Sequence, residues 1–576
     1  MENKRLAELF DEIADMLTIK ETASSKFEVR AYRKAALTIS SLQEPIEDVY
    51  EKGGVAALME LPGVGKGIAG KIEEYLKTGR IRKYAELKKT YPIDFTQLTQ
   101  LEGMGAKRAV LLYKKLRIKN IDDLKKAISS HKIRDLEGFG EKSEQQFEKS
   151  IEILGASRGR LLLGTALPAA EDIVKKIKGS GLAKEVFIAG STRRMRETVG
   201  DIDILALSNK PEELMDFFTK LADVQSVISK GPTKTTVWLG MGLSCDLRVI
   251  DPKSIGAALQ YFTGSKDHNI RVREIAIRKG YKLNEYGLYD RKGKLIESES
   301  EDVIYKKLGM QWVPPEMRES RGEIALAQEG RLPEIIGYGD LHGDLHTHTK
   351  ETDGNASLDE MAEAAIAHGL KYIATTNHTK SARIAHGMDD AHFNSFFRKV
   401  DELNEKLEGR LTILKGAEID ILKDGSLDLE KKTIQQMDCA IASVHSNFNM
   451  GREEMTRRVI KAIESGYIHI LGHPTGREIM EREPYEIDLE KVAEAAERSN
   501  VILEINSQPS RLDLNDTNIM LVSKYKVMFA IDSDSHSTND YDFLKYGIGT
   551  ARRGWLGKER VVNALPLEKA KRVLSK

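Results

Sequence analysis

The spacing of apolar residues changes twice along the chain. Through residues 1–155 apolar side chains recur about every 3.6 residues, which predicts helices joined by short turns that contain glycine. From about 156 to 250, short apolar runs such as EVFIAGS and SCDLRVI predict strands separated by helices. From about 340 onward, runs such as YIATTNH, CAIASVH and VILEIN each precede a helix or loop. The last region therefore predicts repeated βα units, with polar residues at the ends of the strands.

The helical region contains an internal repeat. The element LPGVGKGIAGKIEEYL (Leu61 to Leu76) returns as LEGMGAKRAVLLYKKL (Leu101 to Leu116) and LEGFGEKSEQQFEKSI (Leu136 to Ile151), at spacings of 40 and 35 residues. The glycines permit a tight turn, and the helix that follows offers free N–H groups to a phosphate. These copies resemble helix-hairpin-helix motifs. We therefore expect a nucleic-acid backbone to contact Gly63, Gly65, Gly103 and Gly105.

Length and charge indicate several domains of different kinds. At roughly 100 to 200 residues per domain, 576 residues predict about three to five domains. The net charge of zero conceals 57 basic against 50 acidic side chains in residues 1–335, with an equal acidic excess beyond. Eleven of the 13 histidines follow position 340, which indicates metal in the second half. With no long apolar run and no signal-peptide pattern, we expect a cytoplasmic protein without a membrane partner, and we take a monomer as the default.

A group of carboxylates marks a candidate catalytic centre in the α/β region. Gly190 and Ser191 precede Asp201 and Asp203, and a separate strand carries Asp246. Residues i and i+2 of a strand share a face, so Asp201 and Asp203 point the same way and converge with Asp246 if its strand is adjacent. Such oxygen ligands suit Mg²⁺, with Mn²⁺ as the alternative, in a two-metal site that polarises a 3′ hydroxyl. The Gly-Ser turn and Arg194 would supply donors to a triphosphate.

This constellation resembles the nucleotidyltransferase palm of the DNA polymerase beta family. FEVRAYRKAA, the first hairpin, KGPTK, YFTGS and NEYG occur in that family's order, over about 315 residues. The resemblance implies that Asp201, Asp203 and Asp246 bind the catalytic metals. It also implies nucleotide contacts at Gly190, Ser191, Arg194, Tyr261, Phe262, Gly264 and Asn269, and DNA contacts at Lys234 and Arg273.

The same resemblance bears on lyase chemistry in the first domain. Lys71 aligns with the lysine that forms a Schiff base with a 5′-deoxyribose phosphate in this family. Phe27 and Glu28, however, stand where basic phosphate-binding residues are usual, and Gly67 replaces another lysine. Lyase activity at Lys71 and an ordinary solvated helix lysine are both compatible with the sequence.

The second half carries a larger set of metal-type ligands. They stand at the ends of the βα strands: His346, His348, Asp353, His378, Glu418, His445, His473, Asp534 and His536. Imidazole and carboxylate together favour two or three Zn²⁺, Mn²⁺ or Fe²⁺ ions. The set resembles the PHP domain, a metal-dependent phosphoesterase. That resemblance implies one ion at His346, His348, Glu418 and Asp534, a second at Glu418, His445 and His473, and a third at Asp353, His378 and His536.

The expected architecture is a multidomain α/β protein with helix-hairpin-helix domains, an α+β palm and thumb, and a distorted TIM-like barrel. The boundaries expected are 1–85 for a lyase-like DNA-binding domain, 86–155 for a helix-hairpin-helix fingers domain, 156–250 for the palm, 251–317 for the thumb, 318–337 for a linker and 338–576 for the PHP domain. Together the domains resemble the bacterial and archaeal family X enzymes.

The architecture implies DNA repair, including base excision repair. Its substrates would be gapped or nicked DNA and dNTPs, filled in by a DNA-directed polymerase. The PHP domain would act as a 3′-5′ exonuclease, with abasic-site cleavage or 3′-end processing as further activities. Three alternatives stand beside this function: a small-molecule phosphatase in the PHP half, a DNA end-binding scaffold with little catalysis, and a template-independent nucleotidyltransferase.

Overall fold

The computed structural model describes residues 2–18, 23–40, 46–61, 63–99, 101, 104–156 and 160–575. The chain divides into two compact units, Met1–Arg158 and Gly159–Lys576. Within the described residues no helix combines the length and the apolar character needed to cross a membrane.

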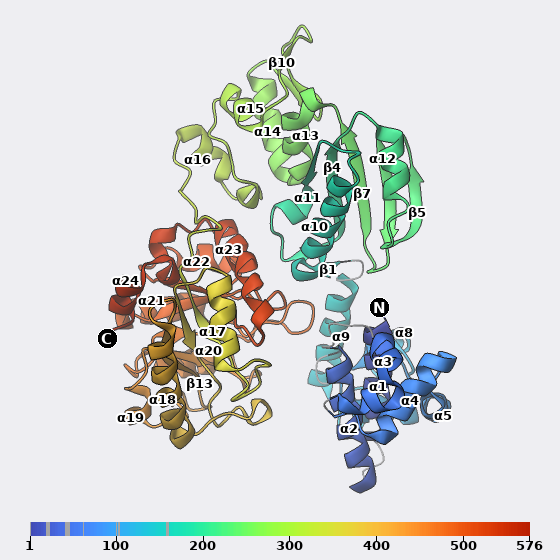
Figure 1. The fold of residues 1–576 in the computed structure, drawn as a ribbon. Helices are drawn as coiled ribbons and strands as arrows, with labels where there is room; N and C mark the ends of the chain where they lie inside the picture. The colour runs from blue at the N-terminus through green and yellow to red at the C-terminus, as the bar shows by residue number, and fades with distance from the viewer. Residues whose placement is uncertain are drawn as a thin grey trace. The chain divides into compact units, whose positions relative to one another are not determined.

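The first unit is helical, as the 3.6-residue spacing predicts (blue to cyan in Figure 1). Its helices are α1 (Glu2–Thr18), α2 (Ala23–Ser40), α3 (Ile46–Glu60), α4 (Lys66–Thr78), α5 (Arg82–Thr90), α6 (Phe95–Leu98), α7 (Ala106–Leu116), α8 (Ile121–Ser129) and α9 (Glu141–Ala156). One hydrophobic core runs from Leu6 to Ile151. The segments expected as separate domains, 1–85 and 86–155, therefore share this core.

The second unit begins with a mixed sheet whose strand order is β2-β4-β7-β6-β5. The strands of this region are β1 (Leu161–Leu162), β2 (Glu185–Ile188), β3 (Thr198–Val199), β4 (Asp201–Leu207), β5 (Val224–Lys230), β6 (Lys234–Leu239) and β7 (Ser244–Ile250). The helices beside them are α10 (Leu163–Gly179), α11 (Gly190–Arg193) and α12 (Pro211–Phe218). Strands β4 and β7 are parallel neighbours at the centre of the sheet.

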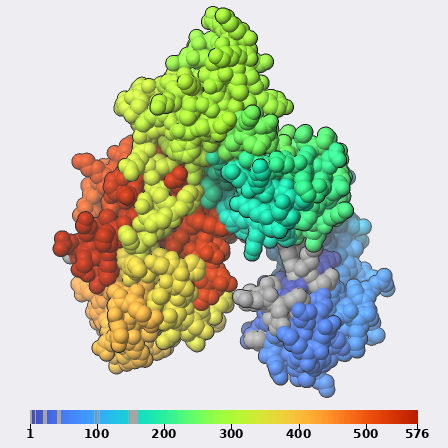
Figure 2. Space-filling view, turned by 45° about the horizontal axis from the view of Figure 1, so that its top comes forward, coloured from blue at the N-terminus to red at the C-terminus, as the bar shows by residue number. Residues whose placement is uncertain are grey.

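A smaller subdomain follows, with the order β10-β9-β8 in its sheet. Its elements are η1 (Pro252–Ser254), α13 (Ile255–Thr263), α14 (Lys266–Arg278), β8 (Lys282–Asn284), β9 (Gly287–Tyr289), β10 (Leu295–Glu297), α15 (Glu301–Lys307), η2 (Pro315–Met317) and α16 (Glu323–Glu329). The expected linker, 318–337, thus contains a helix, and its buried Glu323 binds the His268 imidazole of α14 at 2.7 Å. Figure 2 shows this yellow-green segment against the red C-terminal elements, where Ile336 N donates to Leu556 O.

The C-terminal part is a barrel of parallel strands in sequential order. They are β11 (Gly343–Thr347), β12 (Tyr372–Thr375), β13 (Thr412–Asp420), β14 (Cys439–Ser443), β15 (Ile470–Leu471), β16 (Ile502–Asn506) and β17 (Phe529–Asp532). The surrounding helices are α17 (Leu358–Ala367), η3 (Arg383–Ala385), α18 (Asp390–Leu407), α19 (Lys431–Ile434), α20 (Arg452–Ile463), α21 (Leu489–Ser499), α22 (Asp516–Val522), η4 (Thr538–Phe543), α23 (Leu544–Arg553), η5 (Lys558–Arg560), η6 (Val562–Ala564) and α24 (Leu567–Leu574).

A parallel bridge between Thr347 and Ser535 connects the first strand to the segment after the last. His348 N donates to Ser535 O at 2.8 Å across the same seam. The sheet is thereby nearly closed, so the C-terminal ends of its strands meet around one mouth. The expected distorted TIM-like barrel is confirmed.

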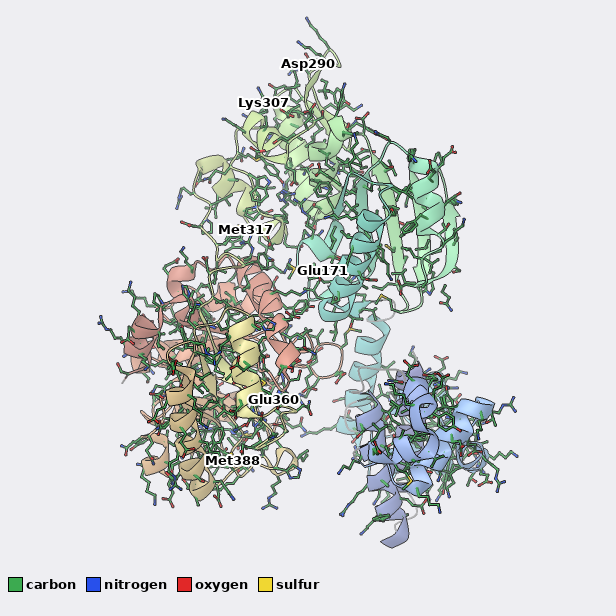
Figure 3. The ribbon with its side chains drawn as sticks, viewed as in Figure 1. Glu171, Asp290, Lys307, Met317, Glu360 and Met388 are labelled. Carbon is green, nitrogen blue, oxygen red and sulfur yellow. The ribbon has the colours of Figure 1, made fainter. Side chains whose placement is uncertain are left out.

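The mixed sheet and the barrel are in direct contact within the second unit. Lys545 of α23 pairs with Glu171 of α10 at 3.1 Å (Glu171 is labelled in Figure 3). A Cβ on Gly164 of α10 would lie 2.3 Å from Pro509 Cβ, so only glycine permits this approach.

Candidate functional site

The three repeats of the first unit share one backbone hydrogen bond. Val64 N donates to Leu61 O at 3.0 Å, Met104 N to Leu101 O at 2.9 Å, and Phe139 N to Leu136 O at 2.9 Å. Each turn leads directly into a helix: α4, α7 or α9.

The first two hairpins present uncapped helix N-termini. Gly65 and Gly105 are the N-cap residues of α4 and α7, with extended backbone and no side-chain cap. Gly63 has φ +78°, which favours glycine. Gly103 lies outside the described residues.

The third hairpin carries acidic residues instead. Glu141 is the first residue of α9, and Glu144 is buried in an ion pair with Arg134 at 2.7 Å. An acid at this position repels a phosphate, so the third copy is less suited to DNA contact than the first two.

Lys71 lies on α4, beyond the first hairpin. Its Nζ donates to Gly67 O at 3.0 Å and sits 5.6 Å from the Tyr32 ring centroid. Phe27 is 75% exposed on α2. The side chain of Lys71 is thus half-buried near the surface, and within the described part of the chain it forms no ion pair.

The palm strands bring the three predicted carboxylates together. Asp203 of β4 and Asp246 of β7 are direct partners in the parallel register, and Asp201 precedes Asp203 on the same face. Ile202, between the two acids, is fully buried in the core. Burial and then the charges of Asp201 and Asp246 raise the pKa of Asp203 to about 7. Three acids crowded in this way fit a divalent cation, which would relieve their repulsion.

The predicted DNA contact Lys234 lies beside this centre. Its Nζ pairs with Asp246 Oδ2 at 2.8 Å, while Thr236 Oγ1 donates to Asp246 Oδ1 at 2.6 Å. Arg248, which the sequence did not single out, approaches the same carboxylate at 3.5 Å and covers the Phe262 ring at 4.6 Å. These cations offset part of the acidic charge of the centre.

The turn before the acids places the predicted triphosphate contacts. Gly190 has φ +61°, and a Cβ there would lie 2.2 Å from Asp203 Oδ2. Ser191 Oγ is buried and has no hydrogen-bond partner among the described residues. Arg194 donates from Nε to Glu319 Oε1 at 3.1 Å, and from Nη1 to Thr263 O.

The predicted nucleotide pocket lies at the end of α13. The Tyr261 and Phe262 rings meet edge to face, with centroids 5.1 Å apart. Gly264 has φ +71° and ends the helix. Asn269 is largely buried: its Nδ2 donates to Tyr261 O at 2.7 Å, and its Oδ1 accepts from Gln260 at 2.8 Å.

Arg273 lies one helical turn beyond Asn269. Its Nε donates to Asn269 O at 3.3 Å, and the side chain is half-buried on α14. The structure thus gathers Tyr261, Asn269 and Arg273 on neighbouring turns of α13 and α14.

The barrel mouth gathers all nine predicted ligands. Their side-chain ligand atoms form three groups within 4.8 Å: His348, Asp353, His378 and His536; His346, His348 and Asp534; and His378, Glu418 and His445. His473 joins through its Nε2, 2.9 Å from Glu418 Oε1. Glu418 lies within 4 Å of five of these histidines, which suits the bridging position that the resemblance implies.

The grouping departs from the implied ion sets in two respects. His348 belongs to the groups of both Asp534 and Asp353, and His378 to the groups of both Asp353 and Glu418. These two imidazoles therefore connect the three clusters.

The ring nitrogens at the mouth fit metal coordination. His346 Nε2 and His348 Nε2 are buried and find no hydrogen-bond partner in the described part of the chain. A buried polar nitrogen without a partner is costly, and an ion would satisfy it.

The histidines of the cluster have pKa values shifted in opposite directions. Burial lowers the pKa of His378, but Glu418 and Asp353 more than offset this and raise the pKa to about 10. Burial and then His536 and His378 lower the pKa of His348 to about 3. Bound cations would take the place of the protons that the carboxylates otherwise attract.

Two carboxylates that orient ligand histidines were not predicted from the sequence. Glu504 Oε1 accepts from His346 Nδ1 at 2.6 Å, and Glu504 Oε2 accepts from His473 N at 2.5 Å. Asp420 Oδ1 accepts from His445 Nδ1 at 2.9 Å. Glu504 is the middle residue of β16, and Asp420 is the last residue of β13. Asp420 lies two residues beyond Glu418, which is the signal that could have found it.

Comparison with known proteins bears on each part of the chain. Family models match a helix-hairpin-helix domain at residues 1–81, a SAM-like helix-hairpin-helix tandem at 95–146, the DNA polymerase beta thumb at 258–319 and the PHP domain at 344–508.

Individual relatives match either nearly the whole chain or a part of it. DNA polymerase/3′-5′ exonuclease PolX of Bacillus subtilis is 34% identical over 571 residues, which cover 99% of this chain and 98% of the relative. A probable phosphatase of Thermoanaerobacter sp. is 32% identical over 232 residues, covering 38% of this chain and 89% of its own. A solved structure of Leishmania infantum polymerase beta covers 39% of this chain and 97% of its own at 23% identity, with a TM-score of 0.26.

Proposed function

Because the chain belongs to the PolX family of DNA polymerase/3′-5′ exonucleases, we propose that it fills short gaps in DNA and trims 3′ ends. The palm and thumb carry the polymerase activity, and the PHP barrel carries the exonuclease. Gapped or nicked DNA and dNTPs are the substrates, and abasic sites and blocked 3′ ends are further substrates of the barrel.

The register of Asp203 against Asp246 is the observation that carries the polymerase function. With Asp201 two residues away, these side chains would hold Mg²⁺ or Mn²⁺. The ions would polarise the primer 3′ hydroxyl and stabilise charge on the triphosphate. The chain's own contribution is position: the Gly190 turn fits against Asp203, and Ser191 and Arg194 would meet the triphosphate.

The DNA would be held by its phosphates. The uncapped N-termini at Gly65 and Gly105 offer backbone N–H groups without a base preference. We therefore expect affinity for gapped DNA to fall as salt increases.

In the barrel, the nine clustered ligands would hold two or three transition-metal ions. Bound ions would activate water and stabilise charge on phosphorus during phosphodiester hydrolysis. Glu504 and Asp420 fix the orientation of His346 and His445 by accepting from their Nδ1 atoms, which leaves each Nε2 free to bind a cation.

A loop at the barrel mouth favours DNA over a small phosphoester. It follows His378 directly and ends at Met388, whose N donates to His378 O at 2.8 Å. Asp428 anchors its base by accepting from Thr379 Oγ1 at 2.6 Å and Ser381 N at 2.9 Å. At its tip Ile384 is 99% exposed.

The residues around that tip are basic. Lys380, Arg383 and His386 are all exposed in the same loop. An apolar tip beside the Lys380 and Arg383 side chains suits a nucleotide base beside phosphates, whereas a small phosphoester would not reach beyond the ions.

A second candidate for the barrel is a small-molecule phosphatase. A probable phosphatase of Thermoanaerobacter sp. that matches 38% of this chain, together with the PHP domain at residues 344–508, favours it. Hydrolysis of p-nitrophenyl phosphate without shortening of DNA would support that alternative.

The test uses a labelled primer on a one-nucleotide gap, with dNTPs and Mg²⁺ or Mn²⁺. Asp203→Ala should abolish extension and retain shortening, and His346→Ala should do the reverse. Asp216→Ala on α12 and His392→Ala on α18, both exposed and outside the two centres, are the matched controls. Shortening that survives His346→Ala would exclude the barrel as the nuclease.

A further inference from the structure

The palm and the barrel meet at the side chain that would bind the triphosphate. Glu319 Oε1 accepts from Arg194 Nε at 3.1 Å and also from Arg553 Nη1 of helix α23 at 2.9 Å. Arg553 Nη1 donates in addition to the backbone O of Arg194, at 2.8 Å. One carboxylate oxygen is therefore shared between a palm arginine and a barrel arginine.

Arg553 is held firmly by the barrel. Its Nη2 donates to Asp516 Oδ2 at 2.6 Å, and Arg321 donates to the same oxygen at 3.0 Å. The Arg553 side chain is 3% exposed. The helix also packs closely on the turn after Arg194, because a Cβ on Gly549 would lie 2.7 Å from Met195 Cε.

The negative charge of Glu319 is balanced by two arginines, Arg194 and Arg553. Burial raises the pKa of Glu319, but Arg553 and Arg194 more than offset this and hold the pKa below its usual value. If Arg553 were lost, the carboxylate would pair mainly with Arg194, since Arg196 is 3.9 Å away. A triphosphate would then compete with a stronger ion pair for the Arg194 guanidinium.

We propose that Arg553, a residue of the PHP barrel, is a positioning residue for nucleotide binding in the palm, because it shares the Glu319 carboxylate and so keeps Arg194 available to the triphosphate. The inference rests on the proposed polymerase function. It makes the barrel part of the nucleotide site, although Arg553 itself touches no substrate.

A general loosening of the contact between palm and barrel would be the alternative explanation. Arg477 offers a matched comparison, since its Nη2 pairs with Glu197 of the palm at 2.7 Å. It is also a buried arginine, and its partners do not include Arg194 or Glu319.

The experiment compares the full-length wild type with Arg553→Gln, Arg477→Gln, Glu319→Gln and the double variant Arg553→Gln/Glu319→Gln. Steady-state gap filling gives KM for the dNTP and kcat separately, and 3′ shortening by the same preparations reports a folded barrel. Arg553→Gln should raise KM about tenfold with kcat changed less than about threefold. Arg477→Gln should leave KM near the wild-type value.

The Glu319 variants distinguish sharing of the Glu319 carboxylate from a general structural effect of losing Arg553. With a neutral side chain at 319 no carboxylate competes with the triphosphate for Arg194, so the double variant should recover a KM within about threefold of wild type. Glu319→Gln alone should leave KM unchanged or lower. Because this variant keeps Arg553, it tests the inference even if Arg553→Gln does not fold.

Equal KM values for Arg553→Gln and Arg477→Gln would overturn the inference about Arg553 but not the proposed polymerase function. So would a double variant no better than Arg553→Gln, or a raised KM for Glu319→Gln. A wild-type protein that incorporates no dNTP would instead overturn the proposed polymerase function, and the inference with it.

Discussion

Replacement of Glu504 by glutamine tests whether this carboxylate sets the tautomer of the metal-ligand candidate His346. The carboxylate is fully buried and accepts three hydrogen bonds: Oε1 accepts from His346 Nδ1 at 2.6 Å, and Oε2 accepts from His473 N at 2.5 Å and Asn506 Nδ2 at 3.3 Å. Because Nδ1 of His346 donates, its Nε2 carries the free electron pair that a cation needs.

A glutamine cannot satisfy the donors on both sides, because only one of its two terminal atoms is an acceptor. If its amide oxygen faces His473 N, its NH₂ faces His346 Nδ1 and favours the tautomer whose Nε2 is protonated and cannot bind a cation. If the amide is turned round, the NH₂ meets the buried His473 N–H, which costs about 1–3 kcal/mol. Either arrangement should lower 3′ shortening about 10- to 100-fold, the usual effect of losing a carboxylate that orients a metal ligand.

The assay measures 3′ shortening of a labelled primer over a series of Mn²⁺ concentrations. Gap filling by the same preparation should be unchanged, because the palm centre does not contact Glu504. Glu494→Gln, an exposed acid of α21 that pairs with Arg498, is the control. Shortening by Glu504→Gln within about threefold of wild type at every Mn²⁺ concentration would refute the tautomer argument.

Four further outcomes are expected. Gly190→Ala should lower gap filling at least about tenfold and spare shortening, because φ is +61° and the new Cβ meets Asp203; equal loss of both activities would point to misfolding instead. Since the pKa of Asp203 is about 7, the Mg²⁺ concentration for half-maximal gap filling should rise about tenfold per pH unit as pH falls below 7, and a flat profile would contradict this assignment. Ile384→Ser should slow shortening of DNA about tenfold, with hydrolysis of p-nitrophenyl phosphate unchanged; parallel loss of both would rule out a strand contact. Borohydride should trap the wild type, but not Lys71→Ala, on DNA with a 5′-deoxyribose phosphate if Lys71 is the lyase nucleophile, and the absence of any trapped complex would leave it a surface lysine.

The sequence alone determined which chemistries the chain carries. The DxD pair at Asp201 and Asp203, the hairpin glycines and the ligands at successive strand ends are local patterns of residue type and spacing. Each pattern needs only a strand, a turn or a helix to be interpreted, and the structure forms these elements at the expected places. The order of helical, mixed α/β and repeated βα regions followed from the same local periodicities.

Only the tertiary structure decided how these residues combine. Glu504 orients His346 from 158 positions away, because β16 and β11 belong to one nearly closed barrel. Arg553 meets Glu319 and Arg194 because α23 packs against the palm. Local spacing cannot specify such pairs, since parallel register, barrel closure and the packing of one subdomain on another are set by long-range burial of apolar surface.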